Sequence, residues 1–399
     1  MRGSPSELGS QGSLPAATRS TPSAAVPTAS RTFRICLWLH RWCGLVSAPF
    51  FLVLCLTGSL LVFHNELQAL LGDVPTVTDY NPTGKLPASL MVQRAKAHYT
   101  DHVPLYVITD AHQPAITTVG MAAANDMTIG SAKPLYFHSG TGQLLQTKDL
   151  MRDTFMGFVF DLHAQWLLDL PGQLFGGLIA VLVLVSLVSG IMVYAPFVKR
   201  IVFGQIRTGK GRVTSQLDWH NFVGVVVAGW LAVVTLTGAF LAIGTIAFNV
   251  WRMTQLKDMT RAYVNKPPLT AIVDVDTAIA ATAQLKPDSR FMGAVFPGSE
   301  FSGNHHYGVF TSGTQAWSAK VFEITLIDAA TGLMTEARAT PWYLKVIMLS
   351  EPLHFGDYGG RPLQIFWLLA TWLTMFITAN GAWLWWAKRP KKHWRRQPP

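Results

Sequence analysis

Four histidines stand at matched positions in the two halves of this sequence, and imidazole is a common ligand of metal ions. Two of them begin the same pattern, His-x3-Gly-x12-Thr-Gly, whose residues are His40, Gly44 and Gly58 in one half and His220, Gly224 and Gly238 in the other. At about 100° per residue, each histidine shares a helix face with its glycines. Such a face leaves room for a flat macrocycle, although close helix packing would explain the glycines alone.

The other two histidines form a second matched pair. His163 and His354 are each followed by a proline eight residues later and by a glycine 27 residues later. The prolines, Pro171 and Pro362, interrupt the apolar segments that follow. Each histidine is therefore expected on a short interfacial segment ahead of its helix.

Four apolar segments are long enough to position these histidines across a membrane, which requires about 20 residues per helix. They are Leu45–Phe63 with its extension back through Arg34–Trp42, Gln173–Ala195, about Phe222–Phe248 and about Leu363–Ala387. The 399 residues are 50% hydrophobic and only 14% charged, which excludes an ordinary soluble protein. Backbone groups in lipid must pair internally, so each segment is predicted to be a helix.

The basic residues near the helix ends predict the orientation. Half of the 32 basic residues lie in the arm before helix one, in the short loop between helices two and three, and in the tail. By the positive-inside rule these three stretches are cytoplasmic, and the segments of about 100 residues after helices one and three lie outside. The net charge of +10 is then explained by topology and membrane lipid, with no nucleic-acid partner.

The whole chain reads as two parallel repeats of helix, α+β segment and helix. The outer segments match through helical stretches at Ala88–His98 and Val275–Leu285 and through strands closed by Thr-Gly turns at Gly142 and Gly332. The predicted regions are a disordered arm at 1–30, helix one at 31–67, an outer module at 68–160, an interfacial segment and helix two at 161–196, a basic loop at 197–216, helix three at 217–249, an outer module at 250–350, an interfacial segment and helix four at 351–387, and a basic tail at 388–399.

Symmetry between the repeats places His40 with His220 at the cytoplasmic face and His163 with His354 at the outer face. Two imidazoles on opposite sides of one iron are the ligands of a b-type haem, so the sequence predicts two haem b groups. His64 is the rival outer ligand, although it points about 240° away from His40 around helix one. Without Cys-x-x-Cys-His, covalent haem attachment is excluded, and Cys36, Cys43 and Cys55 all lie in helix one.

Two other polar groups are candidates for chemistry. His305 and His306, in a predicted exposed loop, could hold a substrate or be merely structural, and a zinc site would need more ligands. Asp357, Tyr358 and Arg361 follow His354 in a glycine-rich loop, where they could contact a haem propionate or a chelate or form an ordinary polar turn.

The segment Leu39-His40-Arg41-Trp42-Cys43-Gly44, with the later Leu-Thr-Gly-Ser-Leu-Leu-Val-Phe, resembles the opening of PepSY-associated transmembrane proteins. The two Thr-Gly-turn segments look like PepSY modules, and the resemblance covers about residues 33–390. It implies a bacterial inner-membrane protein with two periplasmic PepSY-like modules, of a family often linked to iron uptake. Some relatives are di-haem reductases that release iron from ferric siderophores, and other PepSY proteins inhibit peptidases.

Two haems across the bilayer would make the chain a membrane reductase for an outside acceptor, and the resemblance implies that this acceptor is a ferric siderophore in the periplasm. No Gly-x-Gly-x-x-Gly after a strand and no P-loop is present, so electrons must come from a quinol or a separate flavoprotein. One alternative is a tethered PepSY scaffold or peptidase regulator without enzymatic activity. Another is a siderophore or metal permease, which the scarcity of charged residues within the spans argues against.

Overall fold

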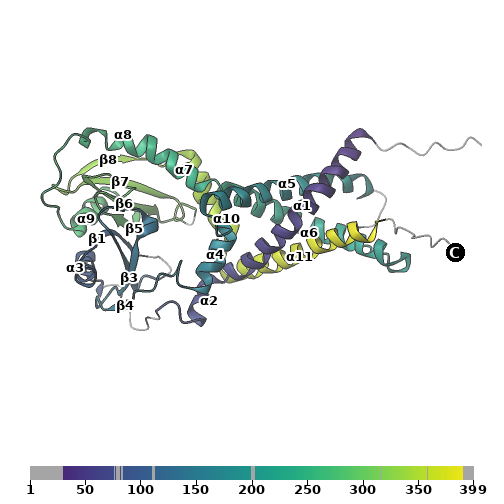
Figure 1. Ribbon diagram of the computed structural model, residues 1–399, viewed down its shortest axis with the longest axis horizontal. Coiled ribbons are helices and arrows are strands. Elements are labelled where there is room, and N and C mark those ends of the chain that lie inside the picture. The colour runs from purple at the N-terminus through teal and green to yellow at the C-terminus, as the bar shows by residue number, and fades with distance from the viewer. Residues whose placement is uncertain are drawn as a thin grey trace, which may run out of the picture.

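The computed structural model describes residues 30–389 apart from 76, 78–80, 82–83, 110–112, 199–202, 316 and 357. The predicted disordered arm, Asp357 and the basic residues Arg2, Arg19, Lys199, Arg200, Lys391, Lys392, Arg395 and Arg396 lie outside the described residues. The remainder forms a helical bundle at one end of the molecule and a β-sheet domain at the other (Figure 1).

Four helices in the described ranges are long and apolar enough to cross a membrane, as the sequence predicts. They are α1 (Arg31–Leu61), α5 (Asp169–Val198), α6 (Arg212–Leu241) and α11 (Gly360–Ala387). Helix α1 packs against α5 and α11, and α6 packs against the same two helices. The chain is therefore a multi-pass membrane protein built on a four-helix bundle.

The third span begins and ends earlier than predicted, and the chain continues beyond it as a separate helical arm. After two residues α6 is followed by α7 (Gly244–Trp251), η4 (Arg252–Leu256), α8 (Lys257–Met259) and η5 (Arg261–Tyr263). The corresponding extension of α1 is only α2 (His64–Leu70). Hydropathy could not separate α6 from α7, because the apolar character continues across the break at 242–243.

Two short helices precede the second and fourth spans, where interfacial segments are predicted. They are α4 (Phe155–Gln165) and α10 (Trp342–Phe355). The chain turns sharply after each: Trp166, Leu167 and Asp169 have positive φ values after α4, and Gly356 and Gly360 do so after α10. Pro171 and Pro362 then fall in the first turns of α5 and α11, where a missing N–H removes no helical hydrogen bond.

The two α+β segments do not form separate modules but join in one antiparallel sheet of eight strands, in the order β4-β3-β2-β1-β5-β6-β7-β8. The first four are β1 (Val103–Thr109), β2 (Ile116–Ala122), β3 (Lys133–His138) and β4 (Leu144–Gln146), and the others are β5 (Ser289–Val295), β6 (His306–Gly313), β7 (Phe322–Asp328) and β8 (Met334–Arg338). The halves meet where Tyr106 of β1 pairs with Val295 of β5. Pairing these strands removes two free sheet edges.

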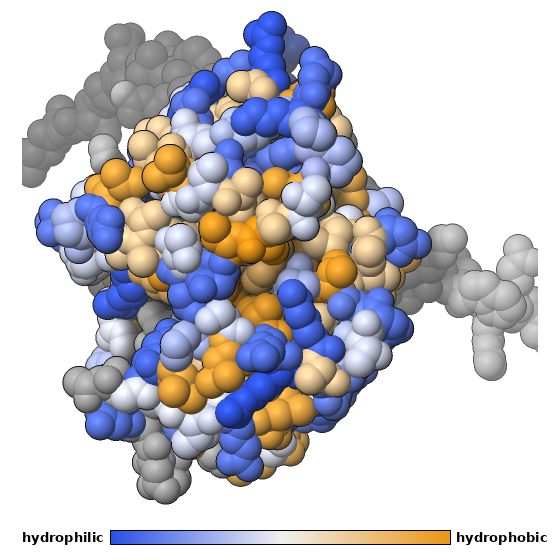
Figure 2. All heavy atoms as spheres, turned by 90° about the vertical axis from the view of Figure 1, so that its left-hand side faces the viewer, coloured by the Kyte–Doolittle hydropathy of each residue, from blue (hydrophilic) through white to orange (hydrophobic). Residues whose placement is uncertain are grey.

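One face of the sheet is covered by α3 (Ala88–His98) and α9 (Val275–Leu285), which have the predicted bounds. The carboxylate of Asp276 on α9 accepts hydrogen bonds from the backbone N–H groups of Ala88 (2.8 Å) and Ser89 (2.9 Å) and so caps α3. Helices α7 and α10 cover the other face over β7. Viewed from its outer end, the sheet domain presents hydrophilic side chains between apolar ones (Figure 2), as expected for a surface in water.

Candidate functional site

The inner pair of histidines consists of His40 on α1 and His220 on α6. Their ring centroids are 6.0 Å apart, and their planes cross at 69°. The start of α6 is fixed by Asp218, whose buried carboxylate accepts hydrogen bonds from the side chain and the backbone N–H of Arg207 at 2.7–3.0 Å. This ion pair holds the loop before α6 and therefore the helix turn that carries His220.

The outer pair consists of His163 on α4 and His354 on α10, two helices that lie outside the spans. Their ring centroids are 6.2 Å apart, with an interplanar angle of 58°. Burial lowers the pKa of His163 and of His354 below the ordinary value. Both imidazoles are therefore neutral at pH 7, which is the protonation state that binds metals.

Three of the four histidines turn Nδ1 toward an oxygen of a neighbouring helix. Nδ1 of His40 lies 2.8 Å from the Ser186 carbonyl oxygen, and Nδ1 of His354 lies 3.0 Å from the Val234 carbonyl oxygen. Because a carbonyl only accepts, Nδ1 carries the hydrogen in both rings and Nε2 keeps its lone pair. This is the arrangement of a metal-binding histidine, whose second nitrogen donates to a carbonyl or carboxylate.

His163 is anchored by a hydroxyl group instead. The Thr57 hydroxyl donates to the Val53 carbonyl oxygen at 2.8 Å and lies 2.8 Å from Nδ1 of His163, so it accepts the imidazole N–H. Thr57 and its counterpart Thr237 belong to the Thr-Gly pairs that the sequence repeats. The Thr237 hydroxyl lies 3.3 Å from Nδ1 of His354.

His220 is the exception among the four. Its Nδ1 is buried and has no hydrogen-bond partner in the part of the chain that the structure describes. The position that matches Ser186 of the inner site is Ile377, whose backbone lies near His220 without meeting hydrogen-bond geometry. Only one imidazole of the inner pair is therefore firmly oriented by a backbone oxygen.

A glycine lies directly against each histidine ring. A Cβ atom built at Gly58 would lie 3.2 Å from His163, at Gly238 3.0 Å from His354, at Gly190 2.7 Å from His40 and at Gly381 3.1 Å from His220. Gly58 and Gly238 therefore face the outer pair, at the far end of the helices that carry His40 and His220. Gly44 contacts Ser186 instead, and a Cβ at Gly224 would meet no atom within 4 Å.

The separation within each pair suits one metal ion between two imidazoles. A histidine nitrogen binds a metal at about 2 Å and lies about 1.2 Å from the ring centroid, so two such rings have centroids about 6.4 Å apart. In the described ranges no three His, Cys, Asp or Glu side chains form a metal-binding group. Among the described side chains, each pair therefore supplies two imidazoles, fewer protein ligands than a zinc site has.

The lesser candidates make contacts of their own, and none of those contacts is with a paired histidine. His64 is exposed at the start of α2, and its Nδ1 lies 3.0 Å from the Leu61 carbonyl oxygen. Arg361 forms an ion pair with Glu66 at 3.1 Å, which links the start of α11 to α2. Both facing pairs are complete without these residues.

The expectation that His305 and His306 lie in an exposed loop is wrong. His305 is 8% exposed and His306, the first residue of β6, is fully buried. Nε2 of His305 lies 2.8 Å from the Pro267 carbonyl oxygen, and the ring of Tyr263 packs on His306 with centroids 4.2 Å apart. Loop-like sequence concealed this burial, because η5 covers the strand only in the folded chain. A role in holding an external substrate does not fit these positions.

Residues 37–388 match the family model for the PepSY-associated TM region. The chain belongs to the PepSY-associated transmembrane family. The family match spans all four membrane helices and the sheet domain together, so it covers both histidine pairs. A comparison with curated proteins finds no match for the chain.

Sequence reasoning missed the glycines that support the inner pair. Gly190 and Gly381 are visible as matched positions 27 residues after His163 and His354. Their spacing did not reveal that each contacts a histidine of a different helix. Ser186 and Thr57 were missed for the same reason, because a hydrogen bond between helices leaves no periodic signal in either segment.

Proposed function

We propose that the chain is a di-haem b reductase of the bacterial inner membrane, which passes electrons across the bilayer to a periplasmic acceptor. The acceptor is a ferric siderophore, from which Fe(II) is released during iron uptake. One observation carries the proposal: two pairs of imidazoles face each other with centroids 6.0 and 6.2 Å apart, one pair at each end of the bundle. Membership of the PepSY-associated family is consistent with it.

The separation of the two pairs along α1 supports the proposed path across the bilayer. His40 and Thr57, which contacts His163, are 17 residues apart on α1, or about 25 Å along the helix. A hydrocarbon core is about 30 Å thick, so the two sites lie near its opposite faces. The proposal includes two parallel repeats about an axis along the membrane normal, with both termini in the cytoplasm and the sheet domain in the periplasm.

The residues of this chain hold and tune the cofactor. His40 with His220, and His163 with His354, would supply the imidazole nitrogens that hold the haem iron, while Ser186, Thr57 and Val234 orient three of the rings through Nδ1. A hydrogen bond at Nδ1 makes the imidazole a stronger ligand and fixes its plane. Bound haem supplies reversible one-electron chemistry at each site.

Reduction would release iron because ferric chelates are held by hard oxygen ligands that bind Fe(II) more weakly. The sequence contains no recognisable dinucleotide or P-loop motif, so the donor in this proposal is a quinol or a separate flavoprotein. It acts at the cytoplasmic face, near His40 and His220.

The deciding experiment is an absorption spectrum of the purified full-length chain before and after dithionite. We expect bis-imidazole bands that correspond to two haems per chain, and Fe(II) trapping by a chromogenic chelator when a ferric siderophore is added. A folded preparation that had been supplied with haem and still lacked a Soret band would overturn the proposal. The non-enzymatic PepSY scaffold would then be the better interpretation.

A further inference from the structure

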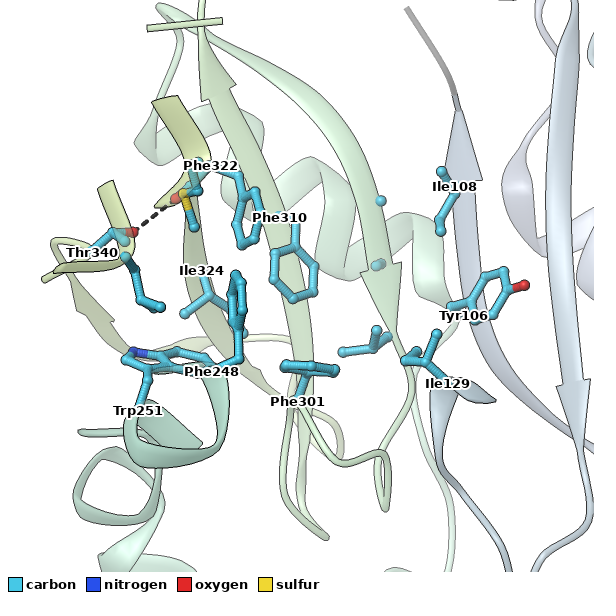
Figure 3. Close-up of a pocket in the computed structure, with 15 residues that line it drawn as sticks. Tyr106, Ile108, Ile129, Phe248, Trp251, Phe301, Phe310, Phe322, Ile324 and Thr340 are labelled. Atoms are coloured by element: carbon cyan, nitrogen blue, oxygen red, sulfur yellow. Dashed lines mark hydrogen bonds between the residues drawn. The ribbon is translucent and has the colours of Figure 1, made fainter. Parts of the chain in front are cut away.

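An apolar pocket of about 270 Å³ lies between the sheet and the helical arm, and none of the four paired histidines lines it. Aromatic side chains from the arm and the sheet converge on it (Figure 3), among them Phe248 and Trp251 of α7, Phe301, Phe310 and Phe322. Its opposite wall is formed by Tyr106 and Ile108 of β1, so both halves of the chain contribute.

The lining determines what kind of group fits. No charged residue lines the pocket. Thr340 is the one lining residue with an aliphatic hydroxyl, and this hydroxyl already donates to the Phe322 carbonyl oxygen at 2.7 Å. A ligand would gain no polar contact at the walls, so the bound part must be hydrocarbon. At about 30 Å³ for a group the size of a water molecule, the pocket holds about nine carbons.

The position of the pocket indicates where such a hydrocarbon comes from. Phe248 lies seven residues beyond the end of α6, or about 10 Å along the helix, and Met348 lies six residues, or about 9 Å, before His354 on α10. Between a hydrocarbon core about 30 Å thick and the bulk water lies an interfacial layer of about 5–7 Å on each side. The pocket therefore begins close to the lipid headgroups.

The outer surface of the arm supports contact with lipid. Ile246, Val250 and Met253 are 40%, 47% and 70% exposed, and they follow one another at helical spacing along the arm. The stripe begins directly after a membrane span, so its first side chains reach the lipid interface, while the rest of the arm runs outward along the sheet (Figure 1). The mouth of the pocket is marked by Ile108, which is 43% exposed.

We propose that this pocket binds one acyl chain of a phospholipid from the adjacent leaflet. The methyl end of the chain enters, and about nine of its carbons lie in the pocket. Filling the pocket removes its aromatic walls from water, and this is the hydrophobic gain, because the acyl methylenes themselves only exchange one apolar environment for another. The bound chain would fasten the sheet domain to the membrane surface beside the outer histidine pair. This inference does not depend on haem.

The test uses Trp251 as a probe in the full-length chain, reconstituted into vesicles of dioleoyl phosphatidylcholine or of the same lipid brominated at carbons 9 and 10. Bromine quenches indole only at short range, so Trp251 should lose most of its emission in brominated vesicles. The emission of Trp251 is obtained by subtracting the emission of Trp251→Phe from that of the parent protein in the same vesicles. Trp317 is 65% exposed and lies outside the pocket. Its emission, obtained in the same way from Trp317→Phe, should be the same in brominated and unbrominated vesicles.

A second pair of variants ties the signal to the pocket. Ile108→Arg places a charge at the mouth and should remove the quenching of Trp251, whereas Ile108→Leu should retain it. Equal quenching of Trp251 and Trp317, or quenching that is the same in both Ile108 variants, would overturn the proposal. Ile108 is partly exposed, so neither substitution removes a buried contact from the core.

Discussion

The histidines of the bundle and those of the sheet domain follow opposite rules. In the bundle, each histidine of one half faces its counterpart from the other half. The ring centroids are 6.0 Å apart in the inner pair and 6.2 Å apart in the outer pair. In the sheet, His306 pairs in register with Asp328, and the matching pair of the first half is Ile116 with His138. A symmetric ligand site between the two halves requires the same side chain from each half. A position within a β-strand requires only a side chain that packs against its neighbours, so a histidine there need not be repeated.

This contrast assigns different roles to histidines that look equally distinctive in the sequence. Those of the bundle are half-buried, face one another and mostly have Nδ1 engaged. His306 is fully buried, and neither ring nitrogen has a hydrogen-bond partner among the described residues. Burial alone therefore does not distinguish the proposed ligands from His306, whereas a facing partner does, and in three of the four so does an anchored second nitrogen.

The largest expected effect comes from removing one ligand of a pair. His40→Ala should remove the inner haem and His163→Ala the outer one, so each variant keeps about half of the haem because the pairs are separate sites. Haem per chain, measured as the pyridine haemochrome, is the readout. His306→Ala is the control and should keep both haems. Loss of haem from that control would break the contrast between bundle and sheet.

The next effect sharpens the role of the anchored nitrogen. Thr57→Val removes the acceptor of the His163 N–H and should weaken haem binding at the outer pair by about 10–100-fold. Thr237→Val should weaken it less, because Nδ1 of His354 also lies 3.0 Å from the Val234 carbonyl oxygen. Haem titration of the apoprotein measures both. Thr57→Ser retains a hydroxyl and should restore binding, and equal losses in the serine and valine variants would contradict this account.

The glycine contacts provide a test at the inner pair. Gly190→Ala places a methyl group 2.7 Å from Nδ1 of His40, and such overpacking costs about 1–3 kcal/mol, or about 5- to 150-fold in haem affinity. Gly229→Ala, on the exposed face of α6 away from His220, meets no atom within 4 Å and serves as the control. The readout is the intensity of the inner-site Soret band, measured in a His163→Ala background. A similar loss from both substitutions would show that general helix packing, and not the ring contact, is responsible.

The smallest effect is expected in the sheet domain and depends on pH. Burial lowers the pKa of His306 from 6.5 to about 4. As the pH falls from 6.5 to about 4, the imidazole of His306 therefore becomes protonated in the unfolded chain but stays neutral in the folded chain. The free energy of unfolding should decrease over this window by at most about 1.4 kcal/mol per pH unit. Thermal unfolding across this range measures the slope, and His306→Asn should flatten it. An unchanged slope in that variant would exclude His306 as the cause.

Much of the local structure could be predicted from the sequence. The four spans follow from hydropathy, and the bounds of α3 and α9 coincide with the predicted helical stretches Ala88–His98 and Val275–Leu285. The Thr-Gly turns at Gly142 and Gly332 have the positive φ values that such turns require. These features depend on residues close together in the chain, so their composition and period are sufficient.

The positions of the matched histidines also came from the sequence, because a repeat places equal groups at equal levels of a bundle. Only the tertiary structure decided what each imidazole touches: the glycine against each ring, the oxygens at Nδ1, and the burial of His306 beneath Tyr263. It also decided that β1 and β5 join two predicted modules into one sheet. Such contacts depend on how distant segments pack, and side-chain periodicity records which face of an element is buried but not which partner covers it.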